Sequence, residues 1–486
     1  MKKCLVIFIF LFAVKSFAQQ NPDIKRTWHW YFGNGAGLDF SSGTAVADTN
    51  GQIHSFESCA VMSDTAGKLL FYTDGDTVWD RRHMMMPNGY GLKSCGNYYG
   101  STAKGTLIVP QPGQDSIYYI FTVDCWENLV IDGVRYSIVN LNKNSGYGDV
   151  VSKNILLFKP STESIVATQS STKDTIWIVT HEYNTNVYRI YKIDKNGLDT
   201  IPIFNKIGNI HSDYVTYMCF SPNGKKLAAF NYGGTSELFD FANGYLTNFI
   251  SLPDGGYGAC FSNDNSKLYF TRDGNTIIQF SLCSDNIPST LTIFYDTTAP
   301  DNSTYGSILN TMDTSLLMVS SIGKDSISTI HICNSKLVSN NVHRFSISLK
   351  GKYSGLGLPN FISTYFNQII NSNICDKDSA IDVTDVHFNI IFIPNVFTPN
   401  NDGVNDNFSI EIAGYKNIEF FIYNRWGNLL IHGNKDLNPQ IKSEEKLWNG
   451  KIQKDDAPTG IYYYLINITN TKNETEIKKG FFQLLK

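Results

Sequence analysis

The chain has 486 residues, and its 40 Lys and Arg against 44 Asp and Glu give a formal net charge of −4. No basic tail or patch is present to bind a nucleic acid or an anionic lipid, so partners of these kinds are not predicted. The 38 Gly, 31 Phe and 27 Tyr favour β-strands joined by turns over long helices.

Residues 1–18 have the pattern of a secretory signal peptide. Lys2 and Lys3 precede a short apolar run, and small residues lead to a predicted cleavage after Ala18. The run is too short for a membrane span, and no later segment approaches ~18 apolar residues, so no transmembrane span is predicted. After cleavage, 37 basic and 44 acidic residues remain, a net charge of −7.

Two central segments repeat one pattern at a spacing of 41 residues. Cys219–Phe230 and Cys260–Phe270 each contain a strand, a polar turn and a second strand that begins at Lys-Leu. Weaker copies place further second strands near residues 68, 116, 174 and 315. This period is typical of propeller blades, so we predict an all-β chain with a six- or seven-bladed β-propeller over residues 26–366. A seventh blade would combine residues 342–366 with residues 26–40 and leave no open sheet edge.

Catalytic motifs are absent from the sequence. It lacks the helical zinc motif, the nucleophile elbow, the phosphate loop and the dinucleotide fingerprint, so no catalytic residue and no cofactor is predicted. The densest polar cluster is Asp74-Gly75-Asp76 with residues 80–83. A paired-carboxylate hydrolase is one interpretation of this cluster, but Asp-Gly between two strand runs favours a hairpin.

Ligand contacts are expected in the loops that follow the second strand of successive blades, because these loops share one face of a propeller. The candidate ligand-binding residues in them are Arg81, Tyr183, Tyr232 and Arg272. The expected ligand is an extracellular glycan or protein. Sugar stacking is a second interpretation of Trp28, Trp30, Trp79 and Trp126, for which packing within a blade is favoured.

Eight cysteines follow the signal peptide, and their irregular spacing predicts no metal site. Cys219 and Cys260 occupy equivalent positions on the innermost strands of adjacent blades. Their Cα atoms are therefore expected to lie beyond the ~7 Å limit for a disulfide, and we predict that the two are not paired with each other.

The last part of the chain, after a linker at residues 367–390, reads as a compact β-sandwich at residues 391–486. Turn formers and aromatic strand runs alternate through it. Asp402, Asn405 and Asp406 offer oxygen atoms suited to a structural calcium ion, but the terminal bidentate Glu of a calcium loop is missing, and a plain turn is favoured. The motif residues are Pro394, Asn395, Phe397, Thr398, Pro399, Asn400, Asp402, Gly403, Asn405, Asp406, Tyr423, Arg425, Trp426, Gly427, Trp448, Gly450, Gly460 and Tyr462.

This run of motifs resembles the gliding motility-associated C-terminal domain, the type B sorting domain of type IX secretion in Bacteroidota. The resemblance implies that the protein passes through the periplasm, that it engages the type IX machinery and its outer-membrane translocon, and that it reaches the outer surface or the medium. Residues 30–40, 69–79 and 118–124 resemble a propeller found ahead of the same domain. A binding or display protein is the favoured function. The alternatives are a propeller enzyme acting on extracellular polysaccharide and a structural or adhesive component of gliding motility.

Overall fold

The computed structural model describes residues 21–95, 101–129, 132–232, 234, 236–272, 274–295, 304–313, 315–332, 341–367, 390–400, 405–413, 415–438, 443–453, 455–470, 473 and 475–485. The predicted signal peptide and most of the predicted linker lie outside these residues. The chain divides into two compact units, Met1–Cys375 and Asp376–Lys486. In the described part of the chain, no helix has the length and apolar character needed to cross a membrane.

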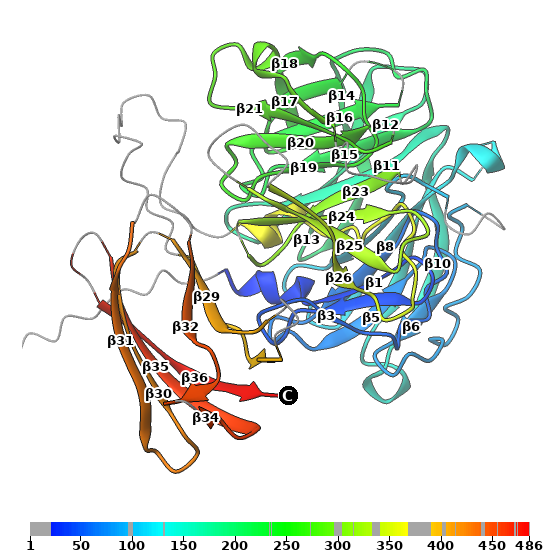
Figure 1. The fold of residues 1–486 in the computed structure, drawn as a ribbon. Coiled ribbons are helices and arrows are strands. Elements are labelled where there is room, and N and C mark those ends of the chain that lie inside the picture. Colours follow the sequence, from blue (N-terminus) through cyan, green and yellow to red (C-terminus); the bar gives the residue numbers. More distant parts are fainter. Residues whose placement is uncertain are drawn as a thin grey trace, which may run out of the picture. The chain divides into compact units, whose positions relative to one another are not determined.

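Seven antiparallel sheets make up the described part of the first unit (Figure 1). Two have three strands: β1 (His29–Phe32), β2 (Ala36–Asp39) and β3 (Val46–Ala47), then β4 (Ala60–Ser63), β5 (Leu69–Thr73) and β6 (Val78–Asp80). Five have four strands, which follow one another in the chain. The first two consist of β7 (Thr106–Pro110), β8 (Ile117–Val123), β9 (Val134–Asn140) and β10 (Asp149–Phe158), and of β11 (Ser161–Gln169), β12 (Ile176–Glu182), β13 (Val187–Asp194) and β14 (Gly197–Lys206).

The last three sheets follow the same order. They consist of β15 (Thr216–Phe220), β16 (Lys226–Asn231), β17 (Ser236–Ala242) and β18 (Tyr245–Leu252), then of β19 (Ala259–Phe261), β20 (Lys267–Arg272), β21 (Thr276–Ser281) and β22 (Thr292–Tyr295), and finally of β23 (Tyr305–Asn310), β24 (Leu316–Ser321), β25 (Ser326–His331) and β26 (Val342–Ser348).

The first strands of successive sheets contact one another in chain order from β4 through β7, β11, β15 and β19 to β23. Radial sheets whose first strands line a common centre define a β-propeller. The six second strands after the N-terminal sheet begin at residues 69, 117, 176, 226, 267 and 316, which confirms the strand starts predicted from the repeat to within two residues.

The prediction for the seventh blade was wrong in one part. Residues 342–348 form β26, which pairs with β25 as the outermost strand of the preceding sheet, and its alternating exposure is that of an edge strand. The N-terminal residues form the sheet β1 to β3, and Asn34 between β1 and β2 pairs with Tyr353, so a later part of residues 342–366 does meet the N-terminal residues.

The ring is closed by a later segment, residues 353–361. Leu356 accepts a hydrogen bond from Ser307 N–H on β23 (2.7 Å) and donates its own N–H to Phe56 O ahead of β4 (2.7 Å). Asn360 adds a bond from its N–H to Cys59 O (2.9 Å) and one from Nδ2 to Ile165 O (2.8 Å). This segment therefore joins the last sheet to the first.

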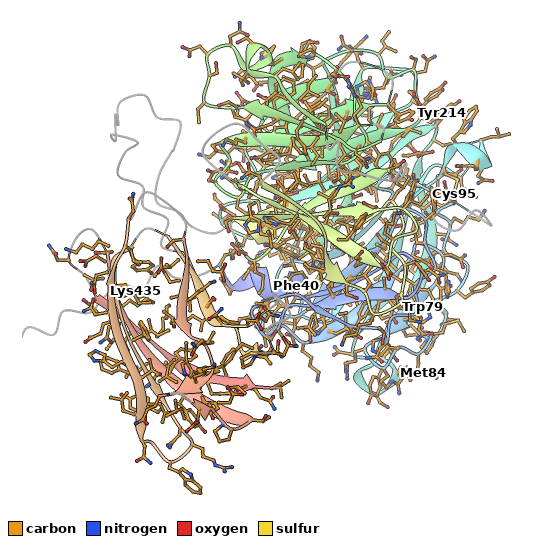
Figure 2. The ribbon with its side chains drawn as sticks, in the orientation of Figure 1. Phe40, Trp79, Met84, Cys95, Tyr214 and Lys435 are labelled. Carbon is orange, nitrogen blue, oxygen red and sulfur yellow. A yellow bond between two sulfur atoms is a disulfide. The ribbon has the colours of Figure 1, made fainter. Side chains whose placement is uncertain are left out.

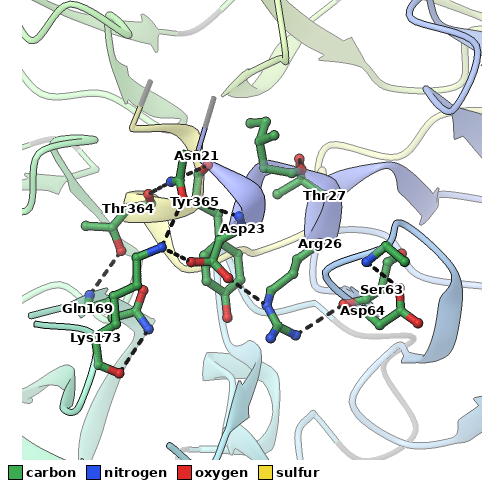
Figure 3. Close-up of polar contacts among 12 residues, drawn as sticks. Asn21, Asp23, Arg26, Thr27, Ser63, Asp64, Gln169, Lys173, Thr364 and Tyr365 are labelled. Carbon is green, nitrogen blue, oxygen red and sulfur yellow. Dashed lines mark hydrogen bonds and ion pairs between the residues drawn. The ribbon is translucent and has the colours of Figure 1, made fainter. Parts of the chain in front are cut away.

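A polar cluster fastens the two ends of the propeller to each other (Figure 3). The short 3-10 helix η1 (Pro22–Thr27) carries Asp23, which is 6% exposed and accepts hydrogen bonds from Arg26 Nε (3.1 Å) and Lys173 Nζ (2.6 Å). Asn21 Nδ2 donates to Thr364 O (3.1 Å) in the C-terminal helix η6 (Ser363–Phe366).

Buried aromatic and β-branched side chains fill the spaces between blades. Trp30, Phe32, Phe361 and Phe366 belong to one cluster that joins residues from the first and last parts of the propeller. Cys219 and Cys260 are both free and buried, which confirms that they are not paired with each other.

The second unit is a β-sandwich. One sheet has the order β28 (Val396–Phe397), β36 (Thr475–Leu484), β35 (Gly460–Asn470), β30 (Tyr415–Tyr423) and β31 (Leu429–Asp436). The other consists of β27 (Ile390–Phe392), β29 (Phe408–Ala413) and β32 (Ser443–Trp448), and β33 (Lys451–Ile452) pairs with β34 (Asp455–Asp456). Phe408 and Phe482 stack between the sheets with their ring centroids 3.8 Å apart. The all-β class with a propeller and a C-terminal sandwich is therefore confirmed.

The polar closure gives a first test of the propeller. Replacing Asp23 with Ala leaves the largely buried Arg26 without its carboxylate partner, so the free energy of unfolding should fall by about 3 kcal/mol. Lys173→Ala is the matched control, because its half-exposed ammonium group should contribute under ~1 kcal/mol. Urea unfolding of the purified protein measures both values. Equal, small losses would show that Asp23 does not fasten the ends.

Candidate functional site

The candidate site lies at the face of the propeller where the second strands end. Two kinds of segment reach it: loops after second strands, such as the one after β8, and segments that lead into first strands, such as residues 207–215 ahead of β15. Antiparallel pairing of Thr216 with Asn231 brings the start of β15 beside the end of β16. We call this region the channel mouth.

An aromatic stack lies at the channel mouth. Tyr183, after β12, stacks on Tyr214 with centroids 3.7 Å apart and planes 9° apart, and Trp126, after β8, contacts Tyr214 at 4.5 Å. Trp126 remains 49% exposed. Interaction with Tyr183, more than burial, raises the pKa of Tyr214 to about 12. Figure 2 shows Tyr214 and Cys95 on the same side of the propeller unit.

Next to the stack is a cavity of about 210 Å³. Its lining residues are Glu57, Val215, Tyr232, Tyr257, Arg272, Thr304, Tyr305 and Leu356. Asp254 forms an ion pair with Arg272. The cavity wall therefore combines tyrosine rings with an arginine whose charge is balanced by a carboxylate. Val215 follows Tyr214 directly in the chain, which brings the cavity near the aromatic stack, but Trp126, Tyr183 and Tyr214 do not line it.

Two carboxyl groups, one buried and one half-buried, lie at the channel mouth. Glu163, at the start of β11, is 2% exposed and accepts hydrogen bonds from Trp126 N–H on Oε1 (2.7 Å) and from Ala103 N–H on Oε2 (3.3 Å). Burial raises the pKa of Glu163 to about 8, with the neighbouring Glu57 acting in the same direction. Burial likewise raises the pKa of Glu57 to about 7, against an opposing interaction with Tyr257.

Three of the four predicted ligand-binding residues lie at the channel mouth. Tyr232 and Arg272 line the cavity, and Tyr183 belongs to the stack. Arg81 lies elsewhere, because it follows β6, the third strand of its sheet, and not a second strand as predicted. Its Nη1 donates to Gly146 O (2.6 Å), and it lines a separate open cavity of about 540 Å³ with Trp28, Tyr31 and His83. These positions test geometry only, and ligand contact by Tyr183, Tyr232 and Arg272 stays a prediction. Ligand contact by Arg81 is also untested, and its separate position makes it a contrast to the other three.

Sequence reasoning missed Tyr214, Tyr257, Glu57 and Glu163. All four sit within three residues of the start of a first strand, whereas the search considered only loops that follow second strands. Their positions just ahead of the apolar runs were the available signal. Packing within a blade was the favoured interpretation of Trp126 and is wrong for it, but it holds for Trp30, which is 1% exposed.

The Asp74 cluster forms the predicted hairpin. Asp74 Oδ1 accepts hydrogen bonds from Asp76 N–H (3.0 Å) and Thr77 N–H (2.8 Å), and Gly75 has a φ of 93° between β5 and β6. The cluster's other acid, Asp80, pairs with Arg82 at 2.6 Å. These bonds account for the residue types in this segment without a reaction.

Several sorting-motif residues of the second unit have structural roles, either in its core or in its turns. Phe397, Trp448 and Tyr462 are buried, and Trp448 Nε1 donates to Lys451 O (2.7 Å). Asn405 has a φ of 54° and its carbonyl accepts from Thr398 N–H (2.9 Å), as a turn former would. Trp426, on the β30–β31 hairpin, is 76% exposed. Asp402 and Gly403 lie outside the described residues, so the calcium alternative is not tested.

Comparison with known proteins identifies the second unit. Residues 391–484 match the family model of the CHU_C Type IX secretion signal domain. This segment is a type IX secretion signal domain, in agreement with the resemblance seen in the sequence. The domain directs export to the cell surface or outside the cell, and it implies contact with the secretion machinery.

The propeller unit has no comparable identification. A comparison with curated proteins finds no match. Structural matches include a candidate 6-phosphogluconolactonase from Bacteroides uniformis, at 12% identity and a TM-score of 0.36, covering 80% of this chain and 96% of that one. They also include the β-propeller domain of Cps50 (Swd1) from Myceliophteria thermophila, at 10% identity and a TM-score of 0.30, covering 53% and 90%. The propeller assignment rests on the strand pairing of this chain and not on these matches.

The buried carboxyl group of Glu163 predicts an unusual pH dependence of stability. The pKa of Glu163 is 4.5 in its ordinary state and about 8 in the folded protein. Between these values the folded state holds a proton that the unfolded state has lost, so stability should fall as pH rises from 5 to 8. Glu163→Gln should flatten this slope, even though its amide suits one of the two N–H donors poorly. Asp115→Asn, which alters an exposed carboxylate of the same unit, is the control. Melting temperatures at five pH values between 5 and 9 measure the slopes, and identical slopes for wild type and Glu163→Gln would contradict the assignment.

Proposed function

We propose that the exported protein binds an extracellular glycan at the channel mouth of its propeller. The observation that carries the proposal is the half-exposed Trp126 stacked with Tyr214 and Tyr183 beside a tyrosine-lined cavity. Aromatic rings that are partly exposed to water offer a flat apolar surface on which the apolar face of a sugar ring can stack.

Polar groups beside the rings supply the second requirement of a sugar site. Ligand pockets combine apolar walls with a few placed hydrogen-bonding groups that fix orientation. Here the cavity wall offers Glu57, Arg272 and the hydroxyls of Tyr232, Tyr257 and Tyr305. Its volume of about 210 Å³ suits a single sugar residue better than a folded protein surface, with the rest of a chain lying across the aromatic stack.

One observation favours a second candidate, hydrolysis of the bound glycan. Burial raises the pKa of Glu57 to about 7 and that of Glu163 to about 8, and a general acid for glycoside cleavage needs a raised pKa of this kind. Glu163, however, accepts backbone hydrogen bonds with both oxygens, which ties it to the loop it supports. Binding is therefore preferred, and release of reducing ends from a bound glycan would decide for hydrolysis.

The binding proposal predicts which aromatic residues matter. Trp126→Ala and Tyr214→Ala should each lower the affinity for a glycan identified on an array by about tenfold or more, or about 1.4 kcal/mol, because each removes a stacking face. Isothermal titration calorimetry measures these affinities. Tyr232→Ala and Arg272→Ala, titrated with the same glycan, test whether the residues that line the cavity contribute to binding.

Two controls separate the channel mouth from other surfaces. Tyr245→Ala removes a Tyr that is 57% exposed on the outermost strand β18, and Arg81→Ala alters the separate open cavity. Both should bind as wild type does. Loss of binding in Arg81→Ala with unchanged binding in Trp126→Ala would move the site to the other cavity.

Export predicts a separate outcome. Deleting residues 391–486 should leave a folded propeller in the periplasm, because the predicted signal peptide would act while the type IX signal domain would be missing. Trp448→Ala should have a similar effect, since truncating a buried Trp costs about 3–5 kcal/mol and this domain is small. Cell fractionation and immunoblotting measure the distribution. Efficient release of the truncated protein would refute the sorting role of this domain.

A further inference from the structure

The loop that presents Trp126 is tied to the propeller by a disulfide bond. Cys125, directly ahead of Trp126, is joined to Cys95, and the bond spans a sequence separation of 30 residues. Both cysteines are buried, at 0% and 2% exposure. The covalent link therefore ends one residue from the exposed ring of the aromatic stack.

Hydrogen bonds inside this loop define its shape. The buried carboxylate of Asp124 accepts from Cys125 N–H (3.0 Å), Asn128 Nδ2 (2.9 Å) and Asp132 N–H (2.7 Å). These partners all belong to residues 124–132. Such bonds keep the loop compact, but they do not fix the loop against β11 and β15, where the rest of the channel mouth lies.

Noncovalent contacts and one covalent bond join the described residues of the loop to other segments. Asp132 forms an ion pair with Lys93 (2.8 Å). Trp126 N–H donates to Glu163 on β11, the Trp126 ring packs on Tyr214, and Glu127 accepts from Ser101 Oγ (2.9 Å). The disulfide is the covalent member of this set. Each hydrogen bond contributes about 1 kcal/mol net and an exposed ion pair contributes under ~1 kcal/mol, whereas a disulfide typically contributes about 2–4 kcal/mol, so the disulfide is the strongest single link between the loop and the rest of the propeller.

We propose that the Cys95–Cys125 disulfide is a redox lock on the glycan-binding channel mouth. In the oxidised protein it holds Trp126 against Tyr214 in the arrangement that binds the ligand; in the reduced protein the loop is released and affinity falls. This inference rests on the proposed function for its consequence, but its structural part has a readout that needs no ligand.

The chemistry of the lock is thiol–disulfide exchange. On oxidation the two thiols lose two protons and two electrons to a disulfide oxidant of the cell envelope, whose own disulfide is reduced to two thiols. In a reducing cytosol such thiols stay reduced and form no disulfide. The channel mouth of an exported chain would therefore be completed only after the chain leaves the cytosol.

Hydrogen–deuterium exchange of the full chain tests the structural part. Peptides covering residues 124–129 and 212–216 should exchange at least tenfold faster in Cys95→Ser/Cys125→Ser than in the oxidised wild type, because the Trp126 N–H and the Tyr214 ring lose their fixed partners. A dithiol reductant should reproduce this change in the wild type and add nothing to the double variant. Unchanged exchange in the double variant would overturn the lock.

Cys283→Ser is the matched control, since Cys283 is also disulfide-bonded but lies after β21. It should leave exchange at residues 124–129 unchanged. Equal acceleration in both variants would show general destabilisation and would also overturn the proposal.

Ligand titration completes the test. A glycan bound by the oxidised wild type should bind at least tenfold more weakly to the double variant and normally to Cys283→Ser. Faster exchange with undiminished affinity would refute the lock on binding while leaving the proposed function intact. If the oxidised wild type binds no glycan, the proposed function fails, and the exchange data still decide whether the disulfide fixes the loop.

Discussion

Leu356 connects β23 to the segment ahead of β4 through two backbone hydrogen bonds, and the propeller depends on this closure. Without it, two sheet edges would expose unpaired N–H and C=O groups. The same connection also fixes the position of Glu57 at the channel mouth. Gly357 packs so closely on the backbone of Glu57 that a Cβ atom there would lie 1.3 Å from Glu57 O, which excludes every other residue type. Ring closure and the position of one acidic group are thus a single constraint.

The channel mouth arises because segments from different blades end at one face. Each antiparallel hairpin returns the chain to the face where its first strand began, so residues ahead of first strands and residues after second strands meet there. Trp126 and Tyr183 arrive by the second route, whereas Tyr214, Tyr257 and Glu57 arrive by the first. Hydrogen bonding between Glu163 and Trp126 links the two sets.

Second strands were predictable because a polar turn followed by Lys-Leu is a local signal, and the hairpin at Asp74 was predictable for the same reason. The meeting of the two ends was predictable as well, since Asn34 and Tyr353 pair and lie in the segments expected to close the ring. The pairing of residues 342–348 with β25 was not predictable, because no turn or periodic pattern near them specifies their partner strand. Part of the site was predictable: Tyr183, Tyr232 and Arg272 lie at or directly after the ends of second strands, which topology assigns to one face. Arg81 follows β6, a third strand, and donates to Gly146.

Raised carboxyl pKa values alone do not mark this site. Burial raises the pKa of Asp74 to about 6, yet Asp74 has two backbone donors in a tight hairpin that explain its presence. Glu163 also binds two backbone N–H groups, but they belong to different segments, one of which carries an exposed aromatic ring. A hydrophobic side chain at position 163 would avoid the cost of a buried acid and would lose the link to Trp126. The acid is therefore best explained by the loop it positions, and the loop by the ring it presents at the channel mouth.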